Sequence, residues 1–202
     1  MQHTNTLPYA QTQDAQDPLR HYRAQFLFPQ YNDQPVRYFC GNSLGLQPKS
    51  VRAALLAELD QWATHGVEGH FRGELPWMYY HKFLTGQTAR LVGAQNSEVV
   101  VMNTLTVNLH LLMVSFYRPT PERYKIIMEA GAFPSDQYAL ETQARFHGFD
   151  PADAIIEIAP RPGEDTLRTE DILETIEKEG SKTALLLFGG VNYYTGQFYD
   201  LP

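Results

Sequence analysis

Residues 98–128 read EVVVMNTLTVNLHLLMVSFYRPTPERYKIIM and place two strand-like runs on either side of a helix-like one. The continuous apolar run at residues 99–102 predicts a strand that is buried on both faces. Residues 106–117 have the spacing of a helix, and residues 124–128 predict the next strand. Strand, helix and strand at this spacing are typical of a βαβ unit, in which the two strands run parallel.

The same alternation continues toward the C-terminal end of the chain. The elements predicted there are a helix at 135–147, a strand at 154–158, a helix from Thr169 to a stop at Gly180, and a strand at 183–188. In the last of these helices we expect Ile172, Leu173 and Ile176 to face inward. The sequence therefore predicts an α/β fold with a mainly parallel sheet of four strands.

The part of the chain before residue 96 has a helical pattern. We predict a short helix from Asp17 and Pro18, because aspartate caps helices and proline suits the first helical position. Two more helices are predicted to start at Pro48 and Pro76. Their apolar positions are Val51, Leu55, Leu59 and Trp62 in the first, and Trp77, Tyr80, Leu84 and Leu91 in the second.

Composition narrows the class of protein. Of the 202 residues, 43% are hydrophobic and 19% charged, which argues against a disordered chain, a collagen-like repeat or a coiled coil. With 23 acidic and 16 basic residues the net charge is −7, so nucleic acid is not an expected partner. One cysteine, Cys40, permits no internal disulfide, and neither a signal peptide nor an 18-residue apolar stretch is visible. We expect a cytoplasmic protein without a membrane partner.

Ligands of open α/β sheets bind beyond the carboxyl ends of the strands, so the loops there are candidate sites. The first such loop, residues 103–106, reads Asn-Thr-Leu-Thr and leads into a helix. Its backbone N–H groups and threonine hydroxyls can bind an anion such as phosphate. The alternative is that Thr104 or Thr106 only caps the helix, which is the more frequent role of threonine there.

A second loop of this kind follows the next predicted strand. Phe133 precedes a helix that Pro134 opens and that carries Ser135 and Asp136 in its first turn. The ring of Phe133 can stack on a flat heteroaromatic ligand, although a core phenylalanine at such a position is more frequent. Together the two loops can bind a phosphate and stack a ring, which describes a phosphorylated planar cofactor.

The other candidate residues are less informative. Gly189 and Gly190 allow close approach of backbone after the last predicted strand, and Tyr193 and Tyr194 can offer hydroxyl groups or pack in a turn. The seven histidines lack metal-ligand spacing, so no metal site is expected. Serine-hydrolase and P-loop motifs do not occur in the sequence.

Several stretches, in one order from about residue 20 onward, resemble the kynureninases. They are Gly41–Pro48 (GNSLGLQP), Met102–Met113 (MNTLTVNLHLLM), Ala132–Asp136 (AFPSD), Arg168–Glu174 (RTEDILE) and Tyr194–Gln197 (YTGQ). The resemblance implies an incomplete fold-type-I pyridoxal-phosphate-dependent large domain (residues 96–202) after an N-terminal helical segment with substrate-wall loops (residues 1–95). It also implies hydrolysis of L-kynurenine or 3-hydroxykynurenine to anthranilate or 3-hydroxyanthranilate and L-alanine, in tryptophan catabolism and NAD biosynthesis.

The resemblance assigns roles to individual residues. Leu105 and Thr106 hold the phosphate of pyridoxal 5'-phosphate, and Phe133 stacks on its pyridine ring. The cofactor loop is completed by Pro134, Ser135 and Asp136, while Ser43 and His70 lie near the substrate. One departure is Gly189, which stands where many members have a cofactor-contacting serine.

The resemblance also implies that catalytic residues lie beyond Pro202: the Schiff-base lysine, the aspartate at the pyridine nitrogen and the arginine at the substrate carboxylate. We therefore expect the 202 residues alone to be inactive, and their partner to be a second copy in a homodimer, as in the family, or a complementing C-terminal fragment. In fold-type-I sheets the first strand lies far from the next three, so residues 99–102 would lack a neighbouring strand and expose their valines. Two alternatives are a non-catalytic remnant or subunit, and a related pyridoxal-phosphate lyase or desulfurase.

Overall fold

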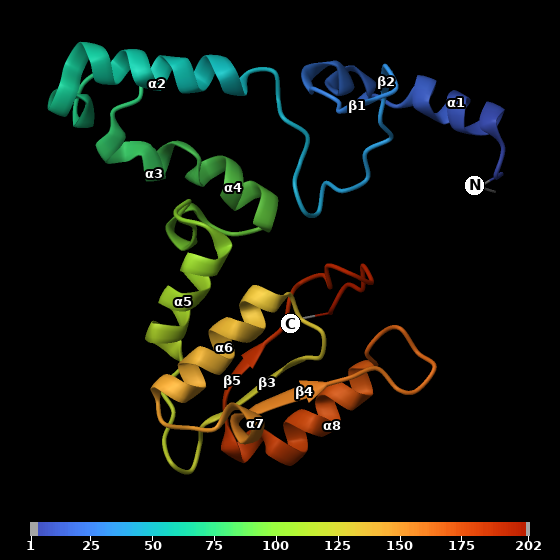
Figure 1. Ribbon diagram of the computed structural model, residues 1–202, viewed down its shortest axis with the longest axis vertical. Coiled ribbons are helices and arrows are strands. Elements are labelled where there is room, and N and C mark those ends of the chain that lie inside the picture. Colours follow the sequence, from blue (N-terminus) through green and yellow to red (C-terminus); the bar gives the residue numbers. More distant parts are fainter. Residues whose placement is uncertain (1–3, 201–202) are drawn as a thin grey trace. The chain divides into compact units, whose positions relative to one another are not determined.

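The computed structural model describes residues 4–200, so Leu201 and Pro202 lie outside the described residues. The chain divides into two compact units, Met1–Val99 and Val100–Pro202 (Figure 1). Each unit has its own secondary structure and is considered by itself.

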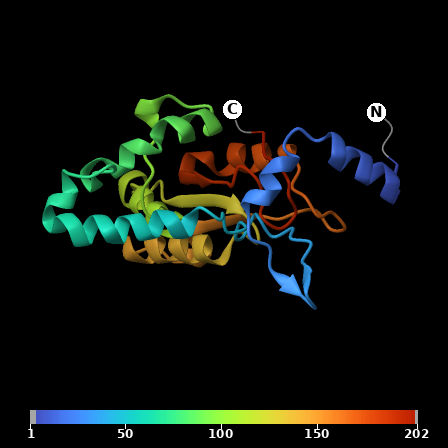
Figure 2. The same ribbon diagram turned by 90° about the horizontal axis from the view of Figure 1, so that it is seen from above.

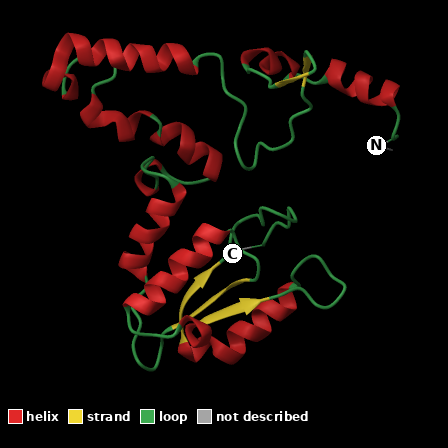
Figure 3. Ribbon diagram, viewed as in Figure 1, coloured by secondary structure: helices red, strands yellow, loops and turns green. Residues whose placement is uncertain are grey.

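The N-terminal unit consists of helices and loops apart from one antiparallel ribbon of two short strands (Figure 3). Its helices and strands are α1 (Leu7–Gln16), β1 (Gln30–Tyr31), β2 (Gln34–Pro35), α2 (Val51–His65), α3 (Tyr80–Phe83) and α4 (Thr85–Val92). Short 3-10 turns lie at Arg20–Gln25, Gly66–His70, Trp77–Tyr79 and Asn96–Glu98. Among the described residues of this unit only Gly69 and Ala89 are buried, so it has little core of its own.

The prediction of a helix from Asp17 and Pro18 was wrong. Helix α1 lies before these residues and has Pro8 in its first turn, while Asp17 is its C-cap with an extended backbone (φ −64°, ψ 118°). The cause is steric, because a proline disfavours the helical conformation of the residue before it. Pro18 therefore ends one helix instead of opening another, and only a 3-10 turn follows.

The helix predicted from Pro48 is α2, which begins at Val51. Its apolar face is not buried, since Leu55, Leu59 and Trp62 are each more than half exposed. The helix predicted from Pro76 is broken into a 3-10 turn, α3 and α4, and two of its apolar positions, Leu84 and Leu91, are exposed. Helical spacing decides which residues share a face, but burial requires another element to cover that face.

The C-terminal unit is a three-stranded parallel sheet with helices on both faces. Its elements are α5 (Leu105–Phe116), β3 (Lys125–Glu129), α6 (Pro134–Phe146), α7 (Pro151–Ala154), β4 (Ile155–Ile158), α8 (Thr169–Glu179), a 3-10 turn (Gly180–Lys182) and β5 (Thr183–Leu187). The strand order is β4-β3-β5, and Ile127 of the central strand pairs with Ile156 and Leu186. These bounds confirm the last three predicted strands and the three predicted helices to within one or two residues.

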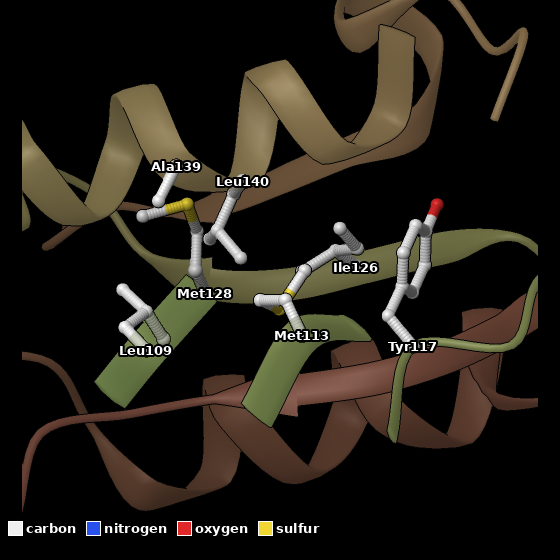
Figure 4. Close-up of a cluster of buried hydrophobic side chains, with 7 residues drawn as sticks. All are labelled: Leu109, Met113, Tyr117, Ile126, Met128, Ala139 and Leu140. Atoms are coloured by element: carbon white, nitrogen blue, oxygen red, sulfur yellow. The ribbon is translucent and has the colours of Figure 1, made fainter. Parts of the chain in front are cut away.

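Alternate residues of β3 point to opposite faces of the sheet. Ile126 and Met128 pack against α5 and α6, as Figure 4 shows. Ile127 lies on the other face with Ile158 and Leu167, covered by Ile172 and Ile176 of α8. Figure 2 shows the sheet between α6 and α8. Full burial of each such side chain contributes about 1.5–3 kcal/mol, which makes these two clusters the main stabilising feature of the unit.

Two details of the predicted core were wrong. Leu173 is 59% exposed, because it lies about 100° around the helix from Ile172 and so leaves the face that Ile172 and Ile176 share. Residues 99–102 form no strand. Strands are stabilised by hydrogen bonds to a neighbouring strand, and no described strand lies beside them. Val100 and Val101 are exposed, which confirms what the resemblance implies for these valines.

Neither a membrane span nor a metal cluster is found in residues 4–200. None of the helices described there has the length and apolar character needed to cross a bilayer. The same residues contain no group of three or more histidine, cysteine or acidic side chains arranged to bind a metal ion.

Candidate functional site

Helices α5 and α6 both begin toward the carboxyl end of β3. Leu109, early in α5, clusters with Met128 near the end of β3 and with Ala139 of α6, whereas Tyr117 lies at the opposite end of the cluster (Figure 4). The hydroxyl of Tyr117 donates to the carbonyl of Tyr124, just before β3, at 2.7 Å. Helix α5 therefore runs antiparallel to β3, and the loops before α5 and α6 lie toward the same edge of the sheet.

The loop before α5 is held by its own side chains. Asn103 has a left-handed backbone (φ 50°), and its amide donates to Asn108, whose amide in turn donates to the carbonyl of Met102 at 2.9 Å. Thr104 caps the helix, accepting from the N–H of Val107 at 3.5 Å. The capping alternative is thus realised by Thr104, and the Thr106 hydroxyl makes no hydrogen bond with a described residue.

This first turn has the donors that an anion requires. The backbone N–H groups of Leu105 and Thr106 have no carbonyl partner inside the helix, and the partial positive charge of the helix dipole lies at this end. Leu105 is exposed and Thr106 half-buried, so this turn lies at the surface of the unit. A phosphate bound here would gain hydrogen bonds from the backbone and from the Thr106 hydroxyl.

The loop before α6 presents an aromatic ring. Phe133 is the N-cap residue, Pro134 follows in the first turn, and the Ser135 hydroxyl donates to Asp136 at 3.2 Å. The ring of Phe133 meets that of Tyr193 edge to face at a centroid distance of 5.2 Å. Because the Phe133 side chain is still 51% exposed, part of its ring surface is available for stacking.

A cavity of about 780 Å³ opens where the residues that follow β3 meet the loop after β5. Its lining includes Glu129, Glu164, Asp165, Asn192, Tyr193 and Tyr199, and contains none of the six residues that the sequence assigns to the cofactor. The Arg168 guanidinium donates to Glu164, which lowers the pKa of that carboxyl and offsets its negative charge. Glu129 and Asp165 add carboxylates to this lining, which disfavours phosphate, whereas the first turn of α5 offers backbone N–H donors.

A buried hydrogen-bond network at this edge was missed in the sequence. Glu129, at the end of β3, is only 7% exposed, and one of its carboxylate oxygens accepts from the Asn192 amide at 2.7 Å and from the Tyr199 hydroxyl. Burial, and next the hydrogen bond to Glu129, raises the pKa of Tyr199. The available signal was a carboxylate that directly follows the apolar run Ile126–Met128 of β3.

Gly189 lies beside this network. A Cβ placed on it would lie 3.3 Å from the carbonyl oxygen of Val191 and 3.5 Å from the second carboxylate oxygen of Glu129. The first distance is tight and the second is ordinary contact. A small side chain can therefore fit here only with a slight adjustment.

Ser43 and His70, assigned to the substrate, lie in the N-terminal unit. Ser43 is exposed in a turn in which its N–H donates to the carbonyl of Cys40 at 3.0 Å. His70 is exposed at the end of a 3-10 turn and meets Trp77 edge to face at 5.4 Å. The neighbouring Gly69 has no room for a side chain, because a Cβ there would lie 2.9 Å from the Trp77 ring.

The residues in the C-terminal unit fit the chemistry of pyridoxal phosphate. The phosphate requires hydrogen-bond donors, which the first turn of α5 supplies. The pyridine ring requires a flat apolar surface, which the half-exposed ring of Phe133 supplies. Both features lie toward the carboxyl edge of β3.

Comparison with known proteins agrees with the motifs. No family model matches the chain. A kynureninase from Koribacter versatilis is 61% identical over 194 residues, which are 96% of this chain and 46% of that protein, and one from Myxococcus xanthus is 59% identical over the same shares. A kynureninase from Nematostella vectensis is 52% identical over 96% of this chain and 44% of its own length. The chain spans about half the length of these relatives, and it matches the N-terminal portion of kynureninase.

Proposed function

We propose that the chain provides the cofactor-binding loops and part of the substrate wall of a pyridoxal-phosphate-dependent kynureninase. The observation that carries this proposal is that the chain is 52–61% identical to the N-terminal portions of kynureninases. The loop geometry supports it, because a phosphate-binding helix start and an exposed aromatic ring lie toward the same edge of the sheet.

In the proposed site the first turn of α5 binds the phosphate through the backbone N–H groups of Leu105 and Thr106 and through the Thr106 hydroxyl. Phe133 packs on the pyridine ring and excludes water from that face. Pro134 fixes the start of α6, so that Ser135 and Asp136 follow the ring in a defined turn. When bound, pyridoxal phosphate supplies the electron sink for cleavage of the substrate's carbon–carbon bond.

In this proposal the two parts of the chain have different roles. Residues 96–202 form the first part of the cofactor domain, and residues 1–95 supply the substrate wall, with Ser43 and His70 near L-kynurenine or its 3-hydroxy analogue. The lysine that carries the cofactor comes from the part of a kynureninase that these 202 residues do not match. We further propose a cytoplasmic homodimer that produces anthranilate or 3-hydroxyanthranilate with L-alanine, in tryptophan catabolism leading to NAD.

The test is a chimera in which these 202 residues replace the matched portion of the Koribacter versatilis kynureninase. The chimera, loaded with pyridoxal phosphate, is supplied with L-kynurenine, and anthranilate is followed by its fluorescence. We expect anthranilate to form, and at a lower rate in a Thr106→Ala chimera. The intact relative serves as the positive control.

Other outcomes separate the alternatives. A folded chimera that binds pyridoxal phosphate without releasing anthranilate would support a non-catalytic remnant. Release of sulfur from cysteine would support a desulfurase. A folded chimera that binds no cofactor, beside an active parent, would contradict the proposal.

A further inference from the structure

We propose that Glu129 is a positioning residue for the cofactor ring: its buried carboxylate holds the loop that fixes the orientation of Phe133. Nothing in the motifs assigns a role to Glu129. The inference deepens the proposed function and rests on it, because Phe133 is the residue proposed to stack on the pyridine ring.

The Glu129 carboxylate lies in a buried environment. Glu129 lies at the carboxyl end of the central strand and is 7% exposed. A single oxygen accepts both the Asn192 amide, at 2.7 Å, and the Tyr199 hydroxyl. Burying a carboxylate is costly unless it is hydrogen-bonded, so these two bonds determine where the donors lie.

The side chain of Asn192 organises the loop after β5. Its side-chain oxygen accepts the backbone N–H groups of Tyr194 at 2.9 Å and Thr195 at 2.8 Å, and also the Thr195 hydroxyl at 3.1 Å. Its amide nitrogen donates to Glu129. Both polar atoms of the Asn192 side chain are therefore in use, so the carboxylate fixes the side chain that in turn fixes the turn at residues 192–195.

Tyr193 connects this turn to the loop before α6. Tyr193 directly follows Asn192, and its ring meets the ring of Phe133 edge to face, with an interplanar angle of 78°. The far side of the same loop is held separately, because the Gln197 side chain bonds both the N–H and the carbonyl of Leu167. Backbone bonds close the turn as well, from the Asn192 N–H to the Gln197 carbonyl at 2.8 Å and from the Gly196 N–H to the Asn192 carbonyl at 3.0 Å. Glu129 adds a side-chain anchor on the side of the loop that carries Tyr193.

These contacts form one continuous path. It runs from the Glu129 carboxylate by a hydrogen bond to Asn192, by the peptide bond to Tyr193, and by a ring contact to Phe133. Releasing the carboxylate would remove the bond that holds the Asn192 amide nitrogen, let Tyr193 move, and remove the support on one edge of the Phe133 ring. The cofactor would then lose affinity although neither Glu129 nor Asn192 contacts the ring.

The experiment compares three single variants of the chimera, Glu129→Leu, Glu129→Gln and Phe133→Leu. A fourth variant combines Glu129→Leu with Phe133→Leu. The measurements are the dissociation constant of pyridoxal phosphate, by absorbance, and hydrogen exchange of the Tyr194 and Thr195 amides. Cooperative urea unfolding checks that each variant is folded.

We expect Glu129→Leu to weaken cofactor binding about three- to tenfold, the scale of one aromatic contact, and to speed exchange of both amides. Glu129→Gln should stay near the wild type, because one amide oxygen can accept both donors. In the Phe133→Leu background Glu129→Leu should have no further effect on affinity, since its effect passes through the ring. A purely structural role would give additive losses of affinity instead.

The failures can be told apart. If the unmodified chimera binds no pyridoxal phosphate, the proposed function and this inference both fall. If it binds the cofactor and Glu129→Leu leaves affinity unchanged, or if the losses of Glu129→Leu and Phe133→Leu add, only the positioning role of Glu129 is overturned. A Glu129→Leu chimera that does not fold leaves Glu129→Gln as the test, and loss of affinity in that folded variant would contradict the inference.

Discussion

The ring of Phe133 meets the ring of Tyr193 edge to face, at a centroid distance of 5.2 Å and an angle of 78°. This contact joins the loop before α6 to the loop after β5, two segments that the sequence separates by about sixty residues. It gives the proposed stacking residue a support on one edge while leaving about half of its surface exposed.

The first prediction concerns Tyr193. Replacing it by leucine removes an edge-to-face contact of about 0.5–1.5 kcal/mol, so cofactor affinity in the chimera should fall about two- to tenfold. Tyr194→Leu is the matched control, because Tyr194 is 85% exposed and neighbours Tyr193 in the same turn. Absorbance titration with pyridoxal phosphate measures both variants. Equal effects of the two substitutions would show that the Phe133 contact carries no affinity.

The second prediction concerns Gly189. Its backbone is not in the left-handed region, so a side chain is limited only by space, and Gly189→Ser should change the free energy of unfolding by less than about 1 kcal/mol. Gly189→Val should be clearly more destabilising, because its branched side chain adds atoms beside the Val191 carbonyl. Urea unfolding compares the two variants. Similar losses for both would contradict this account of the space at position 189.

The third prediction concerns the core between α5 and β3. Met113 is fully buried in the cluster of Figure 4, so Met113→Ala should lower the free energy of unfolding by about 2–5 kcal/mol. Leu111 lies on the same helix but is 48% exposed, so Leu111→Ala should cost less than about 1 kcal/mol. Urea unfolding of both variants tests the orientation of α5. A greater loss for Leu111→Ala would mean that α5 is turned the other way.

The fourth prediction concerns alkaline pH. Burial and the hydrogen bond to Glu129 raise the pKa of Tyr199 above its ordinary value of about 10. Above that pH the unfolded chain loses the phenol proton while the folded chain keeps it, so stability falls as pH rises, by up to about 1.4 kcal/mol per pH unit. Tyr199→Phe should remove this part of the slope in urea unfolding between pH 9 and 11, whereas exposed Tyr31→Phe should not. An unchanged slope in Tyr199→Phe would contradict the assignment.

The sequence predicted helices and strands correctly where another element of the same unit covers their apolar residues. Strands β3, β4 and β5 and helices α5, α6 and α8 lie where their patterns predict, because each buries its apolar residues against a neighbour in the same unit. Residues 99–102 have an equally strong pattern but no described strand beside them, and so they do not form one.

The candidate site was only partly predictable. The loops at 103–106 and 133–136 follow or precede regular elements, so their positions could be inferred from local signals. The network of Glu129, Asn192 and Tyr199 joins residues 63 and 70 positions apart, and no local pattern links such residues. The helix start at Pro18 failed for another reason, since one proline is compatible with both the end and the beginning of a helix.

We propose that one ligand is held by its phosphate at α5 and by its ring at Phe133. The most direct measurement compares binding of pyridoxal phosphate and of pyridoxal, which lacks the phosphate, to the chimera and to its Thr106→Ala and Phe133→Leu variants. We predict that Thr106→Ala weakens binding of pyridoxal phosphate alone, while Phe133→Leu weakens binding of both ligands. If Thr106→Ala affected the two ligands equally, or if neither variant affected either ligand, these loops would not be the cofactor site.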